Sequence, residues 1–356
     1  MSLRQVQIVL PQSKRAELEE ALHEIEHDRW WTSELRENFQ VTNVHTRADQ
    51  CEALIDALVE RFRGAERFRI TLVPVEATHP KLPEPPKPRP EPESPAPRKL
   101  KPLIGRVSRE ELEEDLIHHG MVNRLFVTMT ALSTVVACIG LMKDSPAIII
   151  GAMVIAPLLG PNMALALGST LGDFKLIKRS LIANGVGVGA ALAMSAVVGV
   201  IATINAENPE LAARTSVDYF DIPLAVASGA AGALAATTGA GATLVGVMVA
   251  VALLPPTAAC GLLLGAGEWS SAIKAMLMVL VNVVGINLAA TAVFLAQGIR
   301  PNTWWGAERA RSASTRAIAG WALLLTLLAA LLFVTRDSGA PMDDLLDPRP
   351  AARPGE

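Results

Sequence analysis

Charged side chains are missing from the middle of every long apolar run of this chain, and an ionisable group inside a membrane span is the usual mark of a proton relay. The three cysteines, Cys51, Cys138 and Cys260, lie too far apart to suggest a disulfide or metal framework. The net charge is only −3, which gives no argument for a nucleic-acid partner. A phosphate-binding glycine loop between a strand and a helix, an H-E-x-x-H motif and a nucleophile elbow are also absent. We therefore expect no enzyme, no cofactor and no metal.

The apolar residues are unevenly distributed. Hydrophobic residues make up 51% of the chain, and most of them stand in long runs of Ala, Leu, Val and Gly between residues 121 and 334. The first hundred residues are charged and periodic instead. No signal peptide is evident, because Met1–Leu10 alternates and a charged helix follows at once. This pattern predicts a cytoplasmic N-terminal domain followed by a multi-pass domain in the inner membrane.

Residues 1–77 alternate between two periods. Val6, Ile8 and Leu10 share one face at a period of two, which is typical of a half-buried strand. Leu18 and Leu22 then recur at helical spacing. Strands are expected at 3–10, 30–35, 39–45 and 67–73, with helices at 14–27 and 48–62. This order predicts an α+β ferredoxin-like (βαββαβ) domain.

A linker is expected at residues 78–107, because ten of the residues from 80 to 102 are proline. Such a segment extends as polyproline II, although its P-x-x-P spacings also suit an SH3-type ligand. The capping-box pattern from Ser108 to Glu111 predicts a short surface helix that ends near His119. The membrane domain follows at 108–336, and a disordered tail at 337–356.

Seven spans are expected, since about 20 apolar residues cross the hydrocarbon of a bilayer. Lys and Arg gather before the first span, after the second and after the sixth, which places the N-terminus in the cytoplasm and the C-terminus outside. The expected spans are Met121–Met142, Pro146–Gly172, Leu181–Ile204, Ile222–Thr238, Thr243–Gly265, Ala272–Ile299 and Ala317–Val334.

Two stretches of the chain resemble each other at an offset of 95 residues, the spacing from Pro161 to Pro256. The register continues from Gly172-Asp173-Phe174 to Gly267-Glu268-Trp269. Spans one to three (about 121–204) then correspond to spans four to six (about 222–299), with 317–334 as an extra span. Since three is an odd number, the two copies cross the membrane in opposite senses, as an inverted repeat.

The prolines of spans two and five are predicted to interrupt their helices and to expose helix ends near the middle of the bilayer. Helix ends with free backbone groups are where transporters of this design bind their solutes. The alternative is that the prolines only kink their helices and that the asparagines and threonines are interhelical hydrogen-bonding groups. The candidate binding residues are Pro157, Gly160, Pro161, Asn162, Pro255, Pro256, Thr257, Asn184, Asn282 and Asn287.

The motifs I-A-P-L-L-G-P (residues 155–161) and A-L-L-P-P (residues 252–256) resemble a family of prokaryotic multi-pass proteins. The family is catalogued as hydrophobic domain of unknown function 389, and the likeness covers roughly residues 108–300. It implies a polytopic inner-membrane protein, often with an N-terminal soluble domain. It implies no activity, substrate or binding residue.

Two functions remain open on these grounds. The first is a transporter or channel for a small anionic or neutral polar solute, bound at the proline-broken helices and regulated by the soluble domain. Domains of the ferredoxin-like type often pair through edge strands, so a homo-oligomer is expected. The second is a membrane-anchored ligand sensor or scaffold whose spans do not conduct.

Overall fold

The computed structural model divides the chain into two compact units. The N-terminal unit comprises Met1–Glu114 with Ala296–Gly298, and the helical unit comprises Asp115–Leu295 with Ile299–Glu356. Most of the expected linker and tail, residues 78–106 and 338–356, lie outside the described residues. These are 3–24, 29–34, 38–75, 107–205, 208–216, 220–238, 242–299 and 304–337.

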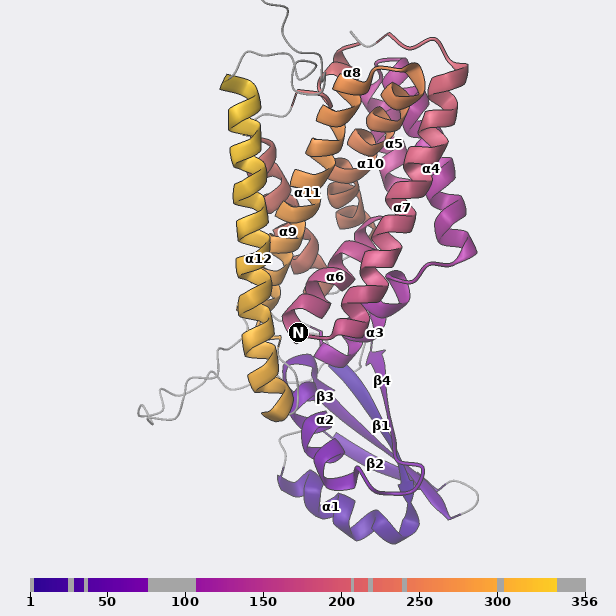
Figure 1. Cartoon of the computed structure of the whole chain (residues 1–356). Helices are drawn as coiled ribbons and strands as arrows, with labels where there is room; N and C mark the ends of the chain where they lie inside the picture. Colours follow the sequence, from indigo (N-terminus) through magenta and orange to yellow (C-terminus); the bar gives the residue numbers. More distant parts are fainter. Residues whose placement is uncertain are drawn as a thin grey trace, which may run out of the picture. The chain divides into compact units, whose positions relative to one another are not determined.

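The N-terminal unit contains a four-stranded antiparallel sheet with the order β2-β3-β1-β4. β1 pairs with both β3 and β4, and β2 pairs only with β3. The predicted succession of strands and helices is therefore confirmed, and the strand order is the one that a split β-α-β arrangement requires. The elements are β1 (Leu3–Pro11), η1 (Gln12–Lys14), α1 (Arg15–Glu24), β2 (Arg29–Glu34), β3 (Phe39–Arg47), α2 (Ala48–Phe62) and β4 (Arg69–Val75) (Figure 1).

The core of this unit is built from the residues whose periodicity predicted it. Val6, Ile8 and Leu10 of β1 are fully buried, together with Leu18 and Leu22 of α1. The stripe on α2 completes the cluster. Burying each of these side chains contributes about 1.5–3 kcal/mol, which makes the stripe the main reason for the helices to pack on the sheet. The buried residues of the α2 stripe are Cys51, Leu54, Ile55, Leu58 and Phe62.

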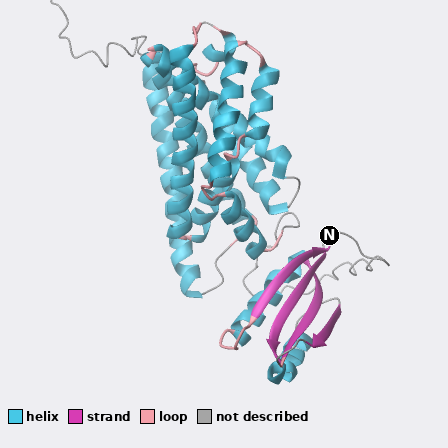
Figure 2. Ribbon diagram, turned by 90° about the vertical axis from the view of Figure 1, so that its right-hand side faces the viewer, coloured by secondary structure: helices cyan, strands magenta, loops and turns pink. Residues whose placement is uncertain are grey.

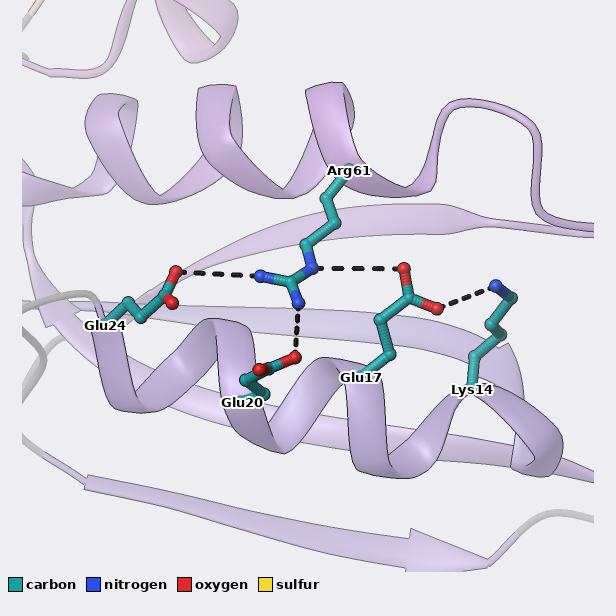
Figure 3. A network of polar contacts seen from close by, with 5 residues as sticks. All are labelled: Lys14, Glu17, Glu20, Glu24 and Arg61. Atoms are coloured by element: carbon teal, nitrogen blue, oxygen red, sulfur yellow. Dashed lines mark hydrogen bonds and ion pairs between the residues drawn. The ribbon is translucent and has the colours of Figure 1, made fainter.

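One arginine ties α1 to α2 (Figure 3). Arg61 of α2 lies 2.5 Å from a carboxylate oxygen of Glu20, 3.6 Å from one of Glu24 and 3.9 Å from one of Glu17. Lys14 in turn contacts Glu17 at 2.7 Å. These side chains are partly exposed, so solvent screens the cluster and its contribution to stability is small.

Helix α3 (Arg109–His119) begins where the capping-box pattern predicted. The backbone N–H of Glu111 donates to Ser108 Oγ at 3.2 Å. The Glu111 carboxylate accepts hydrogen bonds from the guanidinium of Arg4, with distances of 3.0 and 3.2 Å. Since Arg4 is buried at the start of β1, this ion pair holds the start of α3 against the sheet of the same unit.

The described part of the second unit is helical (Figure 2). Among the residues described, three helices are long and apolar enough to cross a membrane, namely α4, α7 and α11, and a bent pair, α5 with α6, makes a fourth if it counts as one span. The helices are α4 (Arg124–Met142), α5 (Pro146–Ile155), α6 (Leu159–Leu171), α7 (Phe174–Ile201), α8 (Pro209–Ala212), α9 (Asp221–Thr238), α10 (Ala242–Ala266), α11 (Trp269–Ala296) and α12 (Trp304–Asp337).

The helix bounds follow the offset of 95 residues. Helices α7 and α11 both have 28 residues, and the bounds of α11 are those of α7 moved by 95 at each end. Helices α6 and α10 end at equivalent positions, Leu171 and Ala266. Each is followed by a glycine in the left-handed region, Gly172 at φ 69° and Gly267 at φ 83°. Equivalent sequences therefore end these helices in the same way.

Glycines bring two pairs of helices into backbone contact. A Cβ added to Gly265 of α10 would lie 2.8 Å from Gly199 Cα of α7, and one added to Gly261 would lie 2.7 Å from the Leu192 carbonyl oxygen of α7. A Cβ on Gly229 of α9 would lie 2.6 Å from Ile286 Cα of α11. Small residues permit such approach in membrane helix pairs, as the Gly-rich composition suggests. We call the contact between α7 and α10 the glycine seam.

Candidate functional site

The helix of the second expected span is interrupted between α5 and α6, as the first proline motif predicted. The two helix axes differ by 57° across the residues between Ile155 and Leu159. Ala156 is extended (φ −69°, ψ 121°), because a residue that precedes proline is disfavoured in helical conformation. Pro157 therefore ends α5, whereas Pro161 lies in the first turn of α6, where a helix tolerates proline. Pro157 and Gly160 are partly exposed, and Pro161 is buried.

Helix α10 is not broken, and here the prediction of a second interrupted helix is wrong. The helix continues from Ala242 to Ala266 through Pro255 and Pro256. A proline at 256 removes the N–H that would donate to the Ala252 carbonyl one turn earlier. Asn282 of α11 replaces that donor, because its Nδ2 donates to the Ala252 oxygen at 2.6 Å. The side-chain amide thus satisfies a backbone group that the proline leaves unpaired.

Thr257 lies 95 residues after Asn162, and its side chain forms a hydrogen bond within its own helix. Its hydroxyl donates to the Leu253 carbonyl at 2.7 Å. Asp173, at the repeat-equivalent end of α6, is the N-cap of α7, since its carboxylate accepts from the backbone N–H groups of Lys175 and Leu176. These residues have structural partners within the protein.

Three of the predicted asparagines come together from three helices. Asn162 of α6 donates through Nδ2 to Asn184 Oδ1 of α7 at 2.8 Å. Asn287 of α11 donates through Nδ2 to Asn162 Oδ1 at 3.0 Å. Asn162 and Asn287 are buried, with exposed fractions of 1% and 0%. The first turn after the break is thereby linked to both α7 and α11.

Each of these amides also donates to the carbonyl one turn back in its own helix. Asn162 donates to Leu158, Asn287 to Val283 and Asn184 to Ser180, at 2.8 to 3.1 Å. If the nitrogen and oxygen of any of these amides were exchanged, its amide oxygen would face a carbonyl oxygen. The carbonyls therefore determine which atom of each asparagine donates and which accepts.

Within the described residues, three buried oxygens beside this series have no hydrogen-bond partner. They are Asn287 Oδ1, Thr291 Oγ1 and Ser180 Oγ. Thr291 follows Asn287 by one turn and Ser180 precedes Asn184 by one turn, so each shares the face of its asparagine. Neither hydroxyl residue was among the predicted site residues, although the spacing of four residues from a candidate asparagine is visible in the sequence. We call Ser180, Asn184, Asn162, Asn287 and Thr291 the asparagine track.

The two free hydroxyls differ from others buried in the same unit. A membrane-helix hydroxyl commonly donates to the carbonyl one turn back. Within the described helices, six buried hydroxyl groups do so, whereas Thr291 and Ser180 do not. Leaving a buried polar atom unpaired costs about 1–3 kcal/mol, so the track is available for a ligand or for rearrangement. The six are Thr130, Thr134, Ser169, Thr170, Ser195 and Thr257.

Among the described residues, no group of three or more His, Cys, Asp or Glu side chains is arranged to hold a metal ion. The chemistry of the track is therefore that of neutral oxygens and amides. It suits a ligand that donates hydrogen bonds or carries a single positive charge, rather than a divalent metal, which prefers carboxylates.

Comparison with known proteins gives a family and a relative for this chain. Residues 153–288, which include the break and every track residue except Thr291, match the family model described as "Domain of unknown function (DUF389)". The chain is also similar to "Uncharacterized protein MJ0678" of Methanocaldococcus jannaschii, with 33% identity over 306 residues, 85% of this chain and 90% of that protein. No solved structure matches. The chain therefore belongs to the DUF389 family of proteins of unknown function.

Proposed function

We propose that the protein is a membrane transporter or channel for a small polar solute, and that the solute passes at the asparagine track. The observation that carries this proposal is the hydrogen bond from Asn287 to Asn162, which joins the two repeat copies beside the helix break and leaves the Asn287 oxygen unpaired. Neutral polar groups often join membrane helices by hydrogen bonds. The unpaired Asn287 oxygen is what distinguishes this contact, because a buried polar atom without a partner is costly.

An inverted repeat supports this interpretation. Asn184 lies ten residues from the start of α7, about 15 Å along the helix. Asn287 lies nine residues from the end of α11, about 14 Å from it. If α7 and α11 cross the membrane in opposite senses, these depths coincide. We accordingly retain seven spans, with the N-terminus in the cytoplasm and the C-terminus outside, as part of the proposal.

The two interfaces between the repeat copies differ in a way that suits transport. The glycine seam joins α7 to α10 through close backbone contact. The repeat-equivalent pair is α11 with α6, and it carries the Asn287–Asn162 hydrogen bond instead. A backbone contact of this kind resists sliding, whereas a polar contact with unpaired atoms has alternative partners. We propose that the seam stays closed and that α6 moves against α11.

The solute is neutral or hydrogen-bond donating in this proposal. Both amide hydrogens of Asn162 and of Asn287 are already engaged, so the track offers oxygens and no free amide donor at these two residues. An anion needs several donors, whereas the unpaired groups of the track are one amide oxygen and the two hydroxyls of Ser180 and Thr291, so the geometry favours the neutral alternative over the anionic one. Asn282 and Thr257 are left out of the site because backbone carbonyls occupy them.

The N-terminal domain is proposed to regulate this unit as a ferredoxin-like module that pairs with a second copy. Its outer strands β2 and β4 each have one neighbour within the described sheet. Free strand edges of this kind pair readily with another chain. Cross-linking of the full-length protein in liposomes would test the oligomer.

The proposal is tested with full-length protein in liposomes. Swelling in urea and in glycerol, followed by light scattering, measures neutral solute entry, and sodium formate provides an anionic comparison. We expect entry of a neutral solute to be lost in Asn162→Leu and Asn287→Leu and kept in Thr257→Val, whose hydroxyl serves only its own helix. Leakage equal to that of empty liposomes for every solute would contradict the proposal and favour a non-conducting, membrane-anchored sensor.

A further inference from the structure

The hydrogen bonds of Asn287 fix the orientation of its amide and leave the amide oxygen unpaired. Asn287 uses both hydrogens of its amide, one for the Val283 carbonyl and one for Asn162 Oδ1. Its Oδ1 is buried and has no donor. Both amide hydrogens of Asn162 already donate to other acceptors, so Asn162 cannot donate to the Asn287 oxygen.

A second oxygen accompanies it. Thr291 is fully buried, lies one turn further along the same face of α11, and has a hydroxyl without a partner. Thr291 does not donate to the carbonyl one turn back in its helix, although six other buried hydroxyls of the described helices make this hydrogen bond. The two residues therefore present two neutral oxygen atoms to one face.

Both atoms are sealed from solvent. A group that completes their coordination must therefore be small. A buried water needs two to four polar partners and its own volume. A dehydrated sodium ion approaches oxygen more closely than water does, and membrane proteins bind such ions through neutral backbone carbonyl oxygens.

The helix break adjoins this position through Asn162. Proline at 157 and at 161 removes the N–H groups that would donate to the carbonyls of Met153 and Pro157 in a continuous helix. Carbonyls at the ends of discontinuous helices are common ligands for sodium in transporters. Asn162 donates to the carbonyl of Leu158, the residue next to Pro157.

We propose that Asn287 Oδ1 and Thr291 Oγ1 are ligands of a sodium ion, bound beside the break between α5 and α6. The ligands are neutral, so a single positive charge is compatible with the site and a double charge is not. A role of this sodium as the coupling ion of a transporter rests on the function proposed above. Its binding can be measured without any transport.

The test uses thermal unfolding of the full-length protein in detergent, in sodium chloride and in choline chloride of equal ionic strength. A ligand that binds only the folded state raises the melting temperature in a saturable manner. We expect such a rise with sodium in the wild type and in Thr257→Val, and none in Thr291→Val. In choline, Thr291→Val should be as stable as the wild type or more so, because it removes an unpaired hydroxyl.

A gain-of-binding variant separates ligand loss from misfolding. Asn287→Asp keeps an oxygen at the position and adds a negative charge, so we expect stabilisation by calcium that the wild type lacks. Equal melting temperatures of the wild type in sodium and choline, as for a site that holds only water, would overturn the inference. Neutral solute entry that persists without sodium leaves the proposed transport standing, whereas sodium binding without any solute entry removes transport and keeps the ion site.

Discussion

The hydrogen bond from Asn282 to Ala252 explains why α10 stays helical through two prolines, and it makes a quantitative prediction. In Asn282→Leu, the Ala252 carbonyl loses the amide that replaces the missing N–H of residue 256. An interhelical hydrogen bond in a membrane protein contributes about 0.6 kcal/mol on average and up to about 1.7 kcal/mol. We expect a loss towards the upper end, since the carbonyl is left without either donor.

A double-mutant cycle isolates this hydrogen bond. Pro256→Ala restores a backbone N–H that can donate to Ala252, so Asn282→Leu should cost much less in that background. A coupling of about 1 kcal/mol is the expected result, since residues that share one hydrogen-bonded group are not additive. Reversible unfolding in mixed detergent micelles measures all four proteins. If Asn282→Leu destabilises both backgrounds equally, the amide does not compensate for the proline and the explanation fails.

Three further predictions concern other parts of the molecule. Gly265→Ala should destabilise the helical unit by about 1–3 kcal/mol, because its Cβ would meet the backbone of α7. In the same unfolding assay, Gly189→Ala should be neutral or stabilising, because its Cβ meets nothing within 4 Å and alanine favours a helix. Arg61→Ala should lower the melting temperature only slightly at low salt and not at all at high salt, because its partners are partly exposed. Burial raises the pKa of the Cys51 thiol from 9.0 to about 12, so the native protein should resist maleimide at neutral pH. Its stability should fall as the pH rises above about 9, because the thiol ionises there in the unfolded chain and not in the folded one. A stability difference between the wild type and Cys51→Ala that does not change with pH would contradict this.

Local patterns determined much of the secondary structure. Alternation in β1 and the four-residue stripes of α1 and α2 depend on which side chains a strand or helix turns to one face, and this is readable without knowing the partner. The Gly-Asp and Gly-Glu exits of α6 and α10 were equally local, since a left-handed residue after a helix favours glycine. Their common offset of 95 residues could therefore be read directly from the order of the residues.

The two proline motifs show where such prediction ends. The sequence predicted a break at both, and only the first is broken. The difference depends on Asn282, which belongs to another helix and reaches α10 only after the chain has folded. A proline motif states which donor is missing, but not whether a distant side chain supplies it.

The order of the amino acids was sufficient for the kinds of element, their approximate ends and the family, because these depend on residue period, length, composition and motifs. Folding in three dimensions established which asparagines meet, which carbonyl each amide satisfies and which oxygens remain unpaired. Hydrogen bonds between helices join residues as far apart as Asn162 and Asn287, and their partners are set by packing rather than by sequence spacing. The candidate site is made of those remaining oxygens, so it exists only where the packed helices bring them together.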